Sequence, residues 1–423
     1  MKQNAHAAER AVAVIGAGLT GLCAALAIGR SGRPVHHVDP DADRHDPRTT
    51  AMLGPTIDML RSLGVWDAIQ PETAPLGRMR IIDGSRRLVR APTTTFDASE
   101  IGQTEFGHNV PNAAAAEALR AAIAECGAIT VHHNRASRID LREDAATVTL
   151  EDGSVIHVAL VVGADGRNSV VRQAANITAR EWRYPQAALV TTFSHEEPHR
   201  DVSTEFHFES GPTTQVPLPN NRSSLVWMDD PAEIDRLSAL NAVDLSQAIE
   251  ERIAHTLGTI EVDGPVGTFP MAGMIAARYG GRRTMLVGEA AHAFPPIGAQ
   301  GFNLSMRDVR DCVAVQRDAA DPGKPDLIAG YERMRVSDAQ RRTLAVDTLN
   351  RSLLSDLLPV QVAKALGLAA LKVLPPLRQA VMREGFRPAP IRSPSMAIGD
   401  LLTRIQRRAE RARAARGPVS PAE

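Results

Sequence analysis

A glycine-rich turn near the start of the chain has the spacing needed to hold a phosphate group. It reads Gly16-Ala17-Gly18-Leu19-Thr20-Gly21, and it follows a short apolar run, Ala11–Ile15, that is typical of a buried parallel strand. In this spacing Gly16 permits the tight turn, Gly18 lets the backbone approach a pyrophosphate, and Gly21 lets the next helix pack closely on the sheet. The start of that helix offers free N–H groups to an anion. Asp39, 18 positions after Gly21, ends the second predicted strand, where a carboxylate can accept hydrogen bonds from ribose hydroxyls. This part of the sequence predicts a dinucleotide site but does not distinguish FAD from NAD.

Two further turns follow predicted strands later in the chain. The second is Gly163-Ala164-Asp165-Gly166-Arg167-Asn168-Ser169, after the apolar run Val158–Val162. Taken alone, an Asp-Gly pair after a strand is usually only a turn. The third is Gly288-Glu289-Ala290-Ala291-His292, which continues through Pro295–Asn303 into a predicted helix from about Gly301 to Arg317. A glycine-rich backbone before a helix can hold an anion or an electron-rich ring edge.

The pattern of apolar residues predicts the elements that position these turns. Leu19–Ser31 is expected to form a helix and Val35–Val38 the next strand, which gives a Rossmann-type strand–helix–strand opening. A helix is also expected over Ala113–Cys126. The middle of the chain predicts Val131–His133, Thr147–Leu150 and Val155–Val162 as strands, with Asp152-Gly153 as a hairpin turn between the last two. Short strands separated by turn residues are then expected at Ala188–Phe193, Thr204–Phe208, Thr213–Leu218 and Ser223–Met228.

We therefore expect an α/β protein in which an antiparallel sheet is inserted into a Rossmann-type domain. The predicted dinucleotide domain comprises residues 10–75, 110–180 and 275–345. The predicted substrate domain comprises 76–109 and 181–274. A helical C-terminal region is expected over 346–395, followed by a basic tail at 396–423.

The three turns together resemble those of a known enzyme family. GxGxxG, then GADG, then G[D/E]AAHxxPPxGAxGxN is similar to the FAD-dependent aromatic hydroxylases of the para-hydroxybenzoate hydroxylase type. Within that family the stretch from Pro296 to Asp308 is similar to the HPxAGQGxNxGxxD pattern of the ubiquinone-biosynthesis hydroxylases. It departs from that pattern at Pro295, at the order of Gly298 and Ala299, and at Ser305. The resemblance extends over roughly residues 10–390.

The resemblance implies FAD as cofactor and a set of residues that contact it. Glu289 stands where the family usually has an Asp that binds the ribitol of FAD, Arg48 is implied at the pyrophosphate or the flavin edge, and Asp165 on the pyrophosphate side. Backbone N–H groups from Gly298 to Asn303 are implied near the pyrimidine end of the ring, and Pro296 is implied to position flavin and substrate. The complete set of expected contacts is Gly16, Gly18, Leu19, Thr20, Gly21, Asp39, Arg48, Asp165, Gly288, Glu289, Pro296, Gly298, Ala299, Gln300, Gly301 and Asn303.

The implied reaction is hydroxylation of an electron-rich aromatic ring by a C4a-hydroperoxyflavin. NAD(P)H or another donor reduces the flavin, molecular oxygen adds to it, and one oxygen atom is transferred to the ring. A water-poor cavity is needed for this transfer. No motif identifies a general base, because Tyr184, Tyr279 and Tyr331 lie outside the motifs, and a structural role is expected for His292.

Composition narrows the remaining classes of function. The formal net charge of −1 gives no overall field that would attract nucleic acid. The three cysteines form no CxxC pair, and no metal-binding pattern is present. We expect a cytoplasmic protein without a signal peptide or spanning segment. The basic stretch Arg404–Arg416 favours a solvated end, with contact to an anionic membrane or a partner as the alternative.

Three interpretations of function stay open at this point. Leucines and valines gather between Leu353 and Leu374, either as ordinary helical core or as an apolar patch that accepts a polyprenyl tail at a membrane or in a quinone-biosynthesis complex. The first interpretation is hydroxylation of such a prenylated phenol. The second is hydroxylation of a small soluble aromatic, and the third is a flavin-binding subunit without catalysis. The sequence does not indicate the oligomeric state.

Overall fold

A parallel sheet lies at the centre of the first part of the fold. The computed structural model describes residues 10–40, 46–87, 90–295, 297–354 and 357–386. Five parallel strands lie in the order β20-β12-β1-β2-β8, and β19 pairs antiparallel with β20 at the edge. Their bounds are Val12–Ile15 for β1, Val35–Val38 for β2, Ile129–His132 for β8, Leu160–Gly163 for β12, Gly280–Gly281 for β19 and Thr284–Leu286 for β20. The strands β1, β12 and β20 are buried along their whole length, as their continuous apolar runs require. The predicted Rossmann-type sheet is confirmed.

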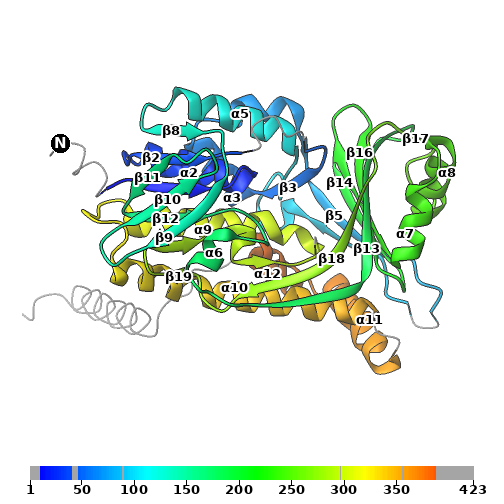
Figure 1. Cartoon of the computed structure of the whole chain (residues 1–423). Coiled ribbons are helices and arrows are strands. Elements are labelled where there is room, and N and C mark those ends of the chain that lie inside the picture. Colours follow the sequence, from blue (N-terminus) through cyan, green and yellow to red (C-terminus); the bar gives the residue numbers. More distant parts are fainter. Residues whose placement is uncertain (1–9, 41–45, 88–89, 296, 355–356, 387–423) are drawn as a thin grey trace, which may run out of the picture. The chain divides into compact units, whose positions relative to one another are not determined.

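Helices α2, α5 and α9 lie together on one face of this sheet (Figure 1). Helix α2 begins directly after Gly18 and packs beside α5 and α9. The bounds are Leu19–Arg30 for α2, Gly54–Ser62 for α3, Trp66–Ile69 for α4, Asn112–Glu125 for α5, Val170–Ala174 for α6 and Gln300–Gln316 for α9. Short 3-10 turns η1, η2, η3 and η4 span Gln70–Glu72, Ala98–Ile101, Gly288–Ala290 and Ile297–Ala299.

One predicted strand is divided between two sheets. The run Val155–Val162 was expected as a single strand, and that prediction is wrong. Strand β11, Val155–Val158, pairs antiparallel with β10, Ala146–Leu150, across the predicted turn at Gly153. After Ala159 the chain enters β12 and pairs with β1 in the parallel sheet. Strand β9, Ala136–Leu141, completes the three-stranded sheet with β10.

The second large sheet has nine strands, in the order β21-β18-β13-β16-β15-β14-β5-β6 with β17 paired to β13. It contains all four strands predicted between Ala188 and Met228. It is antiparallel except where β14 and β5 run parallel. The bounds are Arg78–Asp83 for β5, Thr94–Asp97 for β6, Ala179–His195 for β13, Val202–His207 for β14, Pro212–Leu218 for β15, Arg222–Asp229 for β16, Ile260–Val262 for β17, Gly267–Ala276 for β18 and His292–Ala293 for β21.

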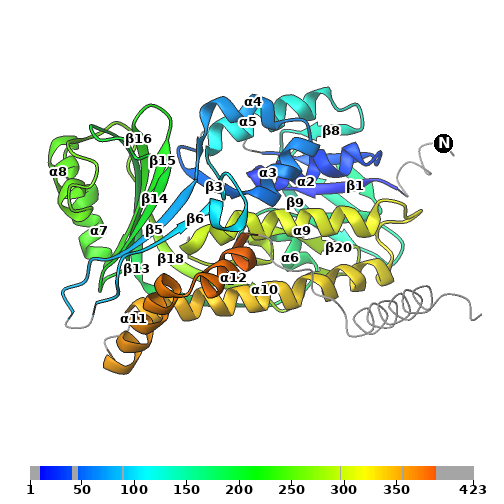
Figure 2. The ribbon, with the colours of Figure 1, turned by 180° about the vertical axis from the view of Figure 1, so that it is seen from behind.

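The two faces of this sheet have different neighbours. Helices α7, Pro231–Ser238, and α8, Ala242–Arg252, pack on one face through an apolar core that includes Phe193, Trp227 and Ile249 (Figure 2). The opposite face contacts the connecting strands, since Thr49 of β3 donates to the Ser224 hydroxyl oxygen at 2.9 Å. Those connecting strands are β3 (Thr49–Leu53), β4 (Ala74–Pro75) and β7 (Gly107–Pro111).

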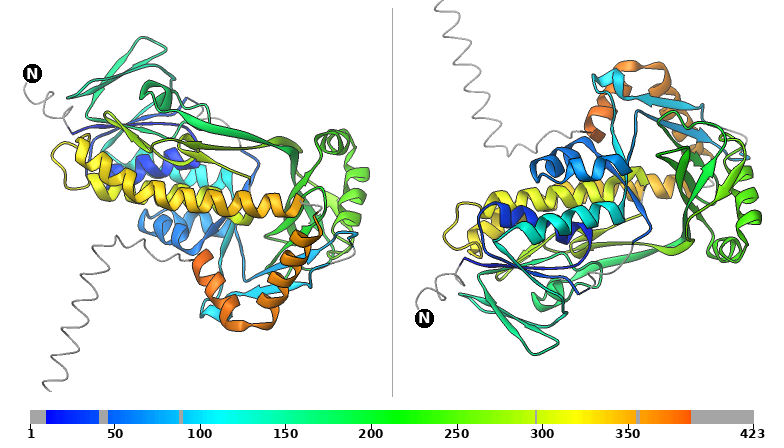
Figure 3. Two further views of the ribbon diagram at one scale, coloured as in Figure 1. Left: turned by 90° about the horizontal axis from the view of Figure 1, so that it is seen from below. Right: turned by 90° about the horizontal axis from the view of Figure 1, so that it is seen from above.

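Helix α10 joins the two sheets. It spans Pro325–Leu354 and runs along the underside from the parallel sheet to the nine-stranded sheet (Figure 3). Helices α11, Leu358–Val373, and α12, Pro375–Phe386, follow it and pack on β6 and η2 respectively. The C-terminal region is thus helical as far as it is described, and residues 387–423, with the basic tail, lie outside the described residues. The domain boundaries predicted from the sequence stay predictions, because residues 10–386 belong to one compact unit.

Candidate flavin site

The first two glycine-rich turns touch each other through their backbones. A Cβ atom placed on Gly16 would lie 2.2 Å from the carbonyl oxygen of Ala164, and Gly16 has a φ of +143°. A Cβ atom on Gly21 would lie 2.2 Å from the carbonyl oxygen of Gly16 itself. Neither position accepts a side chain. Because β1 and β12 are adjacent parallel strands, both turns emerge at the same edge of the sheet.

The third turn lies against the first. Gly288 has a φ of +61°, and a Cβ there would lie 2.9 Å from the methyl carbon of Thr20. Strand β20, which precedes this turn, is parallel to β12 and extends the same edge. The structure therefore brings together all three turns that the sequence singled out, at the carboxyl ends of the parallel strands.

Gly18 faces open space at this meeting point. Apart from its neighbours in the chain, no atom of the described residues would lie within 4 Å of a Cβ atom placed on it, and its φ of −78° is open to any residue. Leu22 makes the first backbone hydrogen bond of α2, to the carbonyl oxygen of Gly18 at 3.0 Å. The N–H groups of Leu19, Thr20 and Gly21 therefore have no partner within the helix. This is the backbone approach that a pyrophosphate needs.

Asp39 carries a buried carboxylate oxygen without a partner. The residue is 1% exposed, and its Oδ1 atom has no hydrogen-bond partner among the described residues. Its Oδ2 atom accepts from Arg120 Nε at 3.2 Å, and Arg120 also reaches the carbonyl oxygen of Ala17 at 3.4 Å. An unsatisfied buried acceptor costs free energy, so Oδ1 fits the ribose hydroxyl donor that the sequence motif implies.

The second turn is held by hydrogen bonds within the turn and with the start of α6. Asp165 accepts from the Ser169 hydroxyl at 2.6 Å and from the Val171 backbone N–H at 3.2 Å, so its carboxylate holds the loop that enters α6. Burial raises the pKa of Asp165 above its ordinary value, against the opposing effect of these hydrogen bonds. Arg172 of α6 then donates to the carbonyl oxygen of Ala290 at 2.9 Å and to that of Arg167 at 2.6 Å. The buried side chain of Arg172 thereby links the third turn to the second through hydrogen bonds.

Asp308 of α9 holds the third turn from beneath. It is fully buried, and its Oδ2 atom accepts from the Gly288 N–H at 2.9 Å and from His292 Nε2 at 2.7 Å. Its Oδ1 atom accepts from Arg335 of α10 at 2.7 Å. Burial alone would raise the pKa of Asp308, but the neighbouring His292 and Arg335 hold it below its usual range. His292 thus makes a structural contact.

The loop before α9 carries two consecutive left-handed residues. Gly298 has φ +63° and Ala299 has φ +54°. The helix then begins at Gln300, and the N–H groups of its first turn, which include Gly301 and Asn303, lie at the open end. The side chain of Gln300 donates to the Gly298 carbonyl oxygen and accepts from Arg342 of α10 at 2.7 Å. Pro296, the predicted catalytic residue, lies outside the described residues.

The Asn303 side chain ties α9 to the connecting strand β3. Its Nδ2 atom donates to the carbonyl oxygens of Ala51 and Ala299, and its Oδ1 atom accepts from the Leu53 N–H and the Thr56 hydroxyl. The side-chain amide of Asn303 thus uses all of its hydrogen-bonding capacity within the protein. Only its backbone N–H is left for the role the sequence predicted.

Arg48 and Glu289 lie at the exposed side of the site. Arg48 forms two hydrogen bonds with Asp46, at 2.8 and 2.6 Å, and its guanidinium lies 5.4 Å from the centre of the Phe269 ring. Burial alone would raise the pKa of Asp46, but hydrogen bonds from Arg48 and Asn112 lower it to about 2. Glu289 is exposed and lies 3.9 Å from Arg167 Nε. Neither Arg48 nor Glu289 is buried, so both side chains are open to a ligand.

An apolar cluster stands beside the third turn. Tyr184, Ala188, Met228 and Met271 of the nine-stranded sheet form it, with Phe294 packed against them. The Tyr184 hydroxyl accepts from Trp182 Nε1 and donates to Asp347 of α10, both at 2.6 Å. We call this buried cluster the apolar wall; it packs against Phe294, which precedes α9.

Comparison with known proteins identifies the family. The model of a family described as an FAD binding domain matches residues 9–344. The ubiquinone hydroxylase UbiL of Rhodospirillum rubrum is 34% identical over 388 residues, which cover 89% of each chain. The chain belongs to this family of FAD-dependent hydroxylases. The 3-demethoxyubiquinol 3-hydroxylase of Escherichia coli is 30% identical and covers 85% of this chain and 94% of its own length.

Solved structures share the fold of this hydroxylase at low sequence identity. The p-nitrophenol 4-monooxygenase PnpA of Pseudomonas putida has a TM-score of 0.75 at 16% identity, over 91% of this chain and 99% of its own. HpxO of Klebsiella pneumoniae, complexed with FAD and uric acid, has a TM-score of 0.71 at 21% identity, over 90% of this chain and 98% of its own. With the family match and the likeness to UbiL, this shared fold makes the hydroxylase an FAD-dependent monooxygenase with a Rossmann-type FAD-binding domain.

The sequence motifs gave no indication of three arginines that support the glycine-rich turns. Arg120 contacts Asp39, Arg172 joins the second and third turns, and Arg335 is the buried partner of Asp308. Each lies on a helix outside the glycine-rich motifs. A single arginine on a helix resembles a solvated one in sequence, so only the tertiary contact distinguishes it.

Proposed function

We propose that this FAD-dependent monooxygenase hydroxylates the aromatic ring of a prenylated phenol in ubiquinone biosynthesis, with NAD(P)H as electron donor and molecular oxygen as co-substrate. The observation that carries the proposal is the 34% identity to a ubiquinone hydroxylase over nearly the whole of both chains. The apolar wall formed by Tyr184, Met228 and Met271 supports it, because an apolar ring needs a water-poor surface.

The residues of the chain supply binding and electrostatics for this reaction. When bound, FAD supplies the chemistry that activates oxygen. The N–H groups of the first turn of α2 would hold its pyrophosphate, and Asp39 a ribose hydroxyl. The N–H groups at the start of α9 place positive potential at the end of the third turn, where they would stabilise negative charge on the ring system. The wall itself would exclude water from an aromatic ring bound beside it.

We further propose a peripheral membrane contact at the cytoplasmic face through α11 and α12. One stripe of α11 exposes large apolar side chains at i, i+4 and i+8 spacing, namely Leu358, Val362 and Leu366, the last 65% exposed. Val373, Leu374, Leu377 and Val381 continue the exposed apolar surface into α12. Among the described residues no single helix is long and apolar enough to cross a membrane, and α11 and α12, which are bent by 102° relative to each other, meet the criteria of length and composition only as a pair. An apolar surface of this kind fits a contact that lies on a bilayer and receives a lipid-like substrate from it.

The substrate assignment is tested with the purified FAD-loaded protein. A diprenylated phenol and the same phenol without its prenyl chain are each supplied with NADH or NADPH and isotopically labelled dioxygen. We expect a ring-hydroxylated product carrying one labelled oxygen, and a kcat/KM for the prenylated phenol at least about 10-fold higher, because the chain buries apolar area.

Two results would contradict the proposal. Equal kcat/KM values for both phenols would favour a hydroxylase of small soluble aromatics. A protein that binds FAD but consumes no oxygen with either nicotinamide donor would instead be a flavin-binding subunit.

The membrane contact is tested by vesicle flotation. Leu366→Glu places a charge in the exposed stripe of α11, and we expect the vesicle-bound fraction to fall about fivefold or more, since a charge at an apolar interface is costly. Val243→Glu is the matched control, because Val243 is 77% exposed on α8, away from the stripe. Equal binding of both variants and the unchanged protein, or no flotation of the unchanged protein, would overturn the contact.

A further inference from the structure

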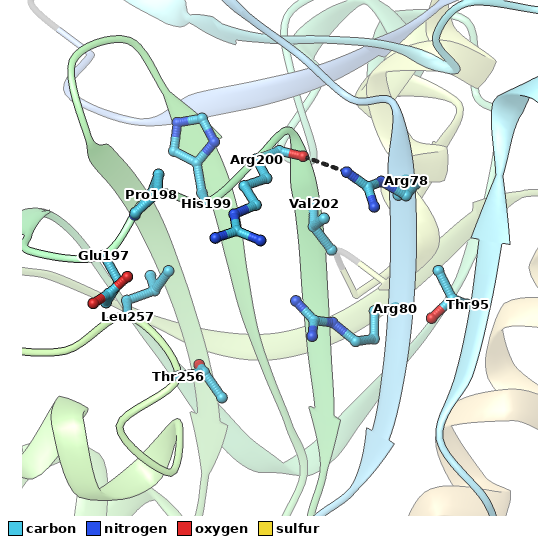
Figure 4. A pocket seen from close by; sticks show the side chains of 10 residues that line it. All are labelled: Arg78, Arg80, Thr95, Glu197, Pro198, His199, Arg200, Val202, Thr256 and Leu257. Atoms are coloured by element: carbon cyan, nitrogen blue, oxygen red, sulfur yellow. Dashed lines mark hydrogen bonds between the residues drawn. The ribbon is translucent and has the colours of Figure 1, made fainter.

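A cavity of about 460 Å³ lies on the side of the nine-stranded sheet away from the apolar wall. Arg78 and Arg80 of β5, Thr95 of β6 and Val202 of β14 line it, and the turn after α8 closes it with Thr256 and Leu257 (Figure 4). Side chains alternate between the faces of a strand, so Arg78, Arg80 and Ile82 share one face. Ile82 packs on the core beneath α7 and α8. The cavity therefore opens on the face opposite Ser224 and the FAD-binding turns.

Positive charge predominates in this cavity. Arg78, Arg80 and Arg200 line it together with His199, and Glu197 is its one acidic lining residue. Figure 4 shows the guanidinium groups of Arg80 and Arg200 reaching into the same space, with Glu197 at its far side. Arg78 Nη2 donates to the Arg200 carbonyl oxygen at 3.1 Å, which fixes the loop that carries Arg200 against β5. In the part of the chain that the structure describes, none of these three arginines forms an ion pair with a carboxylate.

Of the three arginines, Arg80 has a buried guanidinium nitrogen that lacks a hydrogen-bond partner among the described residues. This nitrogen is the Nε atom of Arg80. Burial, together with the nearby charge of Arg78, lowers the pKa of Arg80. A partly buried guanidinium without a carboxylate is costly, and an anion in the cavity would offset that cost.

A row of polar side chains extends from the cavity into the sheet. Thr95, Arg80, Thr204 and Gln215 are directly opposite one another on β6, β5, β14 and β15. Thr95 is exposed, whereas Thr204 and Gln215 are each 1% exposed. The Thr204 hydroxyl and Gln215 Oε1 have no partner among the described residues either. Three polar atoms that lack partners in a single row indicate a place built for a polar ligand rather than for packing.

We infer that this cavity binds the phosphate group of a small phosphorylated molecule, at a site separate from the FAD site. Guanidinium groups match the geometry of phosphate oxygens and can bind them in pairs. The Thr95 hydroxyl can donate to the same group. The cavity volume falls in the range of small-ligand sites, which leaves room for the organic part of a phosphate monoester. The ligand can be free in solution or can be the headgroup of a lipid, since both present the same chemistry.

The experiment uses the FAD-loaded full-length protein, so that the pyrophosphate site is already occupied. Calorimetry measures the binding of glycerol 3-phosphate at constant ionic strength. Flotation measures the additional binding caused by phosphatidate in phosphatidylcholine vesicles. We expect Arg80→Gln and Arg200→Gln each to weaken one of these interactions by about 10-fold, a typical loss for one charge-assisted pair. Arg138→Gln, an exposed arginine on β9, is the control and should change neither by more than about twofold.

The two probes distinguish the source of the ligand. Loss of glycerol 3-phosphate binding in the Arg80 and Arg200 variants assigns a soluble metabolite. Loss of only the phosphatidate-dependent increment in those variants assigns a lipid headgroup. Absence of binding in both experiments, or equal affinity in all variants, would overturn the inference. Because Arg200 is exposed and its backbone contact is retained, Arg200→Gln is expected to keep its thermal unfolding temperature, which excludes unfolding as the cause.

Discussion

At the scale of single residues, the glycines of the first turn have separate physical reasons for being glycine. Gly16 and Gly21 are excluded from carrying a side chain by backbone atoms 2.2 Å away, so they are required by the protein itself. A Cβ atom on Gly18 would meet no described atom beyond its chain neighbours, so its lack of a side chain is not required by the protein and leaves room for the proposed pyrophosphate. Asp39 is similar, since its buried Oδ1 atom has no partner among the described residues and can accept from a ribose hydroxyl of FAD.

This difference predicts that one substitution affects FAD affinity and another affects the stability of the protein. Gly18→Val is expected to leave the unfolding temperature of the FAD-free protein unchanged and to lower FAD affinity by about 10-fold or more, since a branched side chain would occupy the approach to the pyrophosphate. Gly21→Ala is expected to destabilise even the FAD-free protein by about 2 kcal/mol, through overpacking against Gly16. Thermal melts and fluorescence titration with FAD measure both. An unstable FAD-free Gly18→Val protein would contradict this assignment.

At the scale of elements, three helices hold the turns in place. Helix α6 reaches the third turn through Arg172, α9 reaches it through Asp308, and α10 supplies Arg335. The strands bring the turns to one edge, and these buried polar contacts set their spacing. FAD binding should therefore depend on side chains that do not touch FAD.

Arg172→Met should loosen the second and third turns from each other. The substitution removes the two hydrogen bonds that the charged guanidinium donates, and the two carbonyl oxygens that accepted them lose their donor. We therefore expect a loss of about 3 kcal/mol in unfolding free energy. FAD affinity should fall together with it. Arg167→Met, in the same loop but half-exposed, should change stability by less than about 0.5 kcal/mol. Urea unfolding of both FAD-free variants measures the difference, and equal losses would refute this role of Arg172.

The start of α9 carries strain that a glycine would relieve. Ala299 adopts a left-handed conformation at φ +54°, which costs a residue with a Cβ about 1 kcal/mol. Ala299→Gly is expected to raise stability by up to that amount, whereas Gly298→Ala at φ +63° should lower it by about 1 kcal/mol. Thermal melts of the two variants should shift in opposite directions. Shifts of the same sign would contradict the left-handed assignment of this pair.

At the scale of the whole molecule, the buried charges between α9 and α10 connect the FAD site to both sheets. Asp308 and Arg335 join the third turn to α10, and α10 in turn reaches β13 through Asp347 and Tyr184. Arg335 also contacts Asp311 and Asp338. We therefore expect acid to lower the stability of both sheets together.

The direction of this pH dependence follows from the lowered pKa of Asp308. Its stabilising contribution is fully present above the ordinary carboxyl pKa of about 4 and is lost as the pH falls through the lower folded value. Asp46, with a pKa of about 2, adds to the loss over the same range. We expect the unfolding temperature to fall between about pH 5 and pH 2. Asp308→Asn should cost about 3–5 kcal/mol at neutral pH, because Arg335 stays buried without its partner, and should flatten the acid dependence. An unchanged acid dependence in this variant would contradict the role of Asp308, with exposed Asp140→Asn as the control.

The sequence by itself determined the FAD-binding half of this protein to a large extent. The turns at Gly16, Gly163 and Gly288 follow continuous apolar strands. A strand followed by a glycine-rich turn is formed by adjacent residues, so it can be recognised in the sequence. It also predicted the strands between Ala188 and Met228, because their alternation is local. It placed one strand at Val155–Val162, since apolar periodicity cannot show that a chain leaves one sheet and enters another at Ala159.

Only the tertiary structure decided which distant side chains support the site. Arg120, Arg172 and Arg335 act across separations that no local pattern records, and the row from Thr95 to Gln215 exists only once four strands are in register. Burial and pairing are properties of the folded chain, because they depend on which elements meet. A sequence therefore fixes which backbone can hold a phosphate, whereas folding fixes which charges surround it.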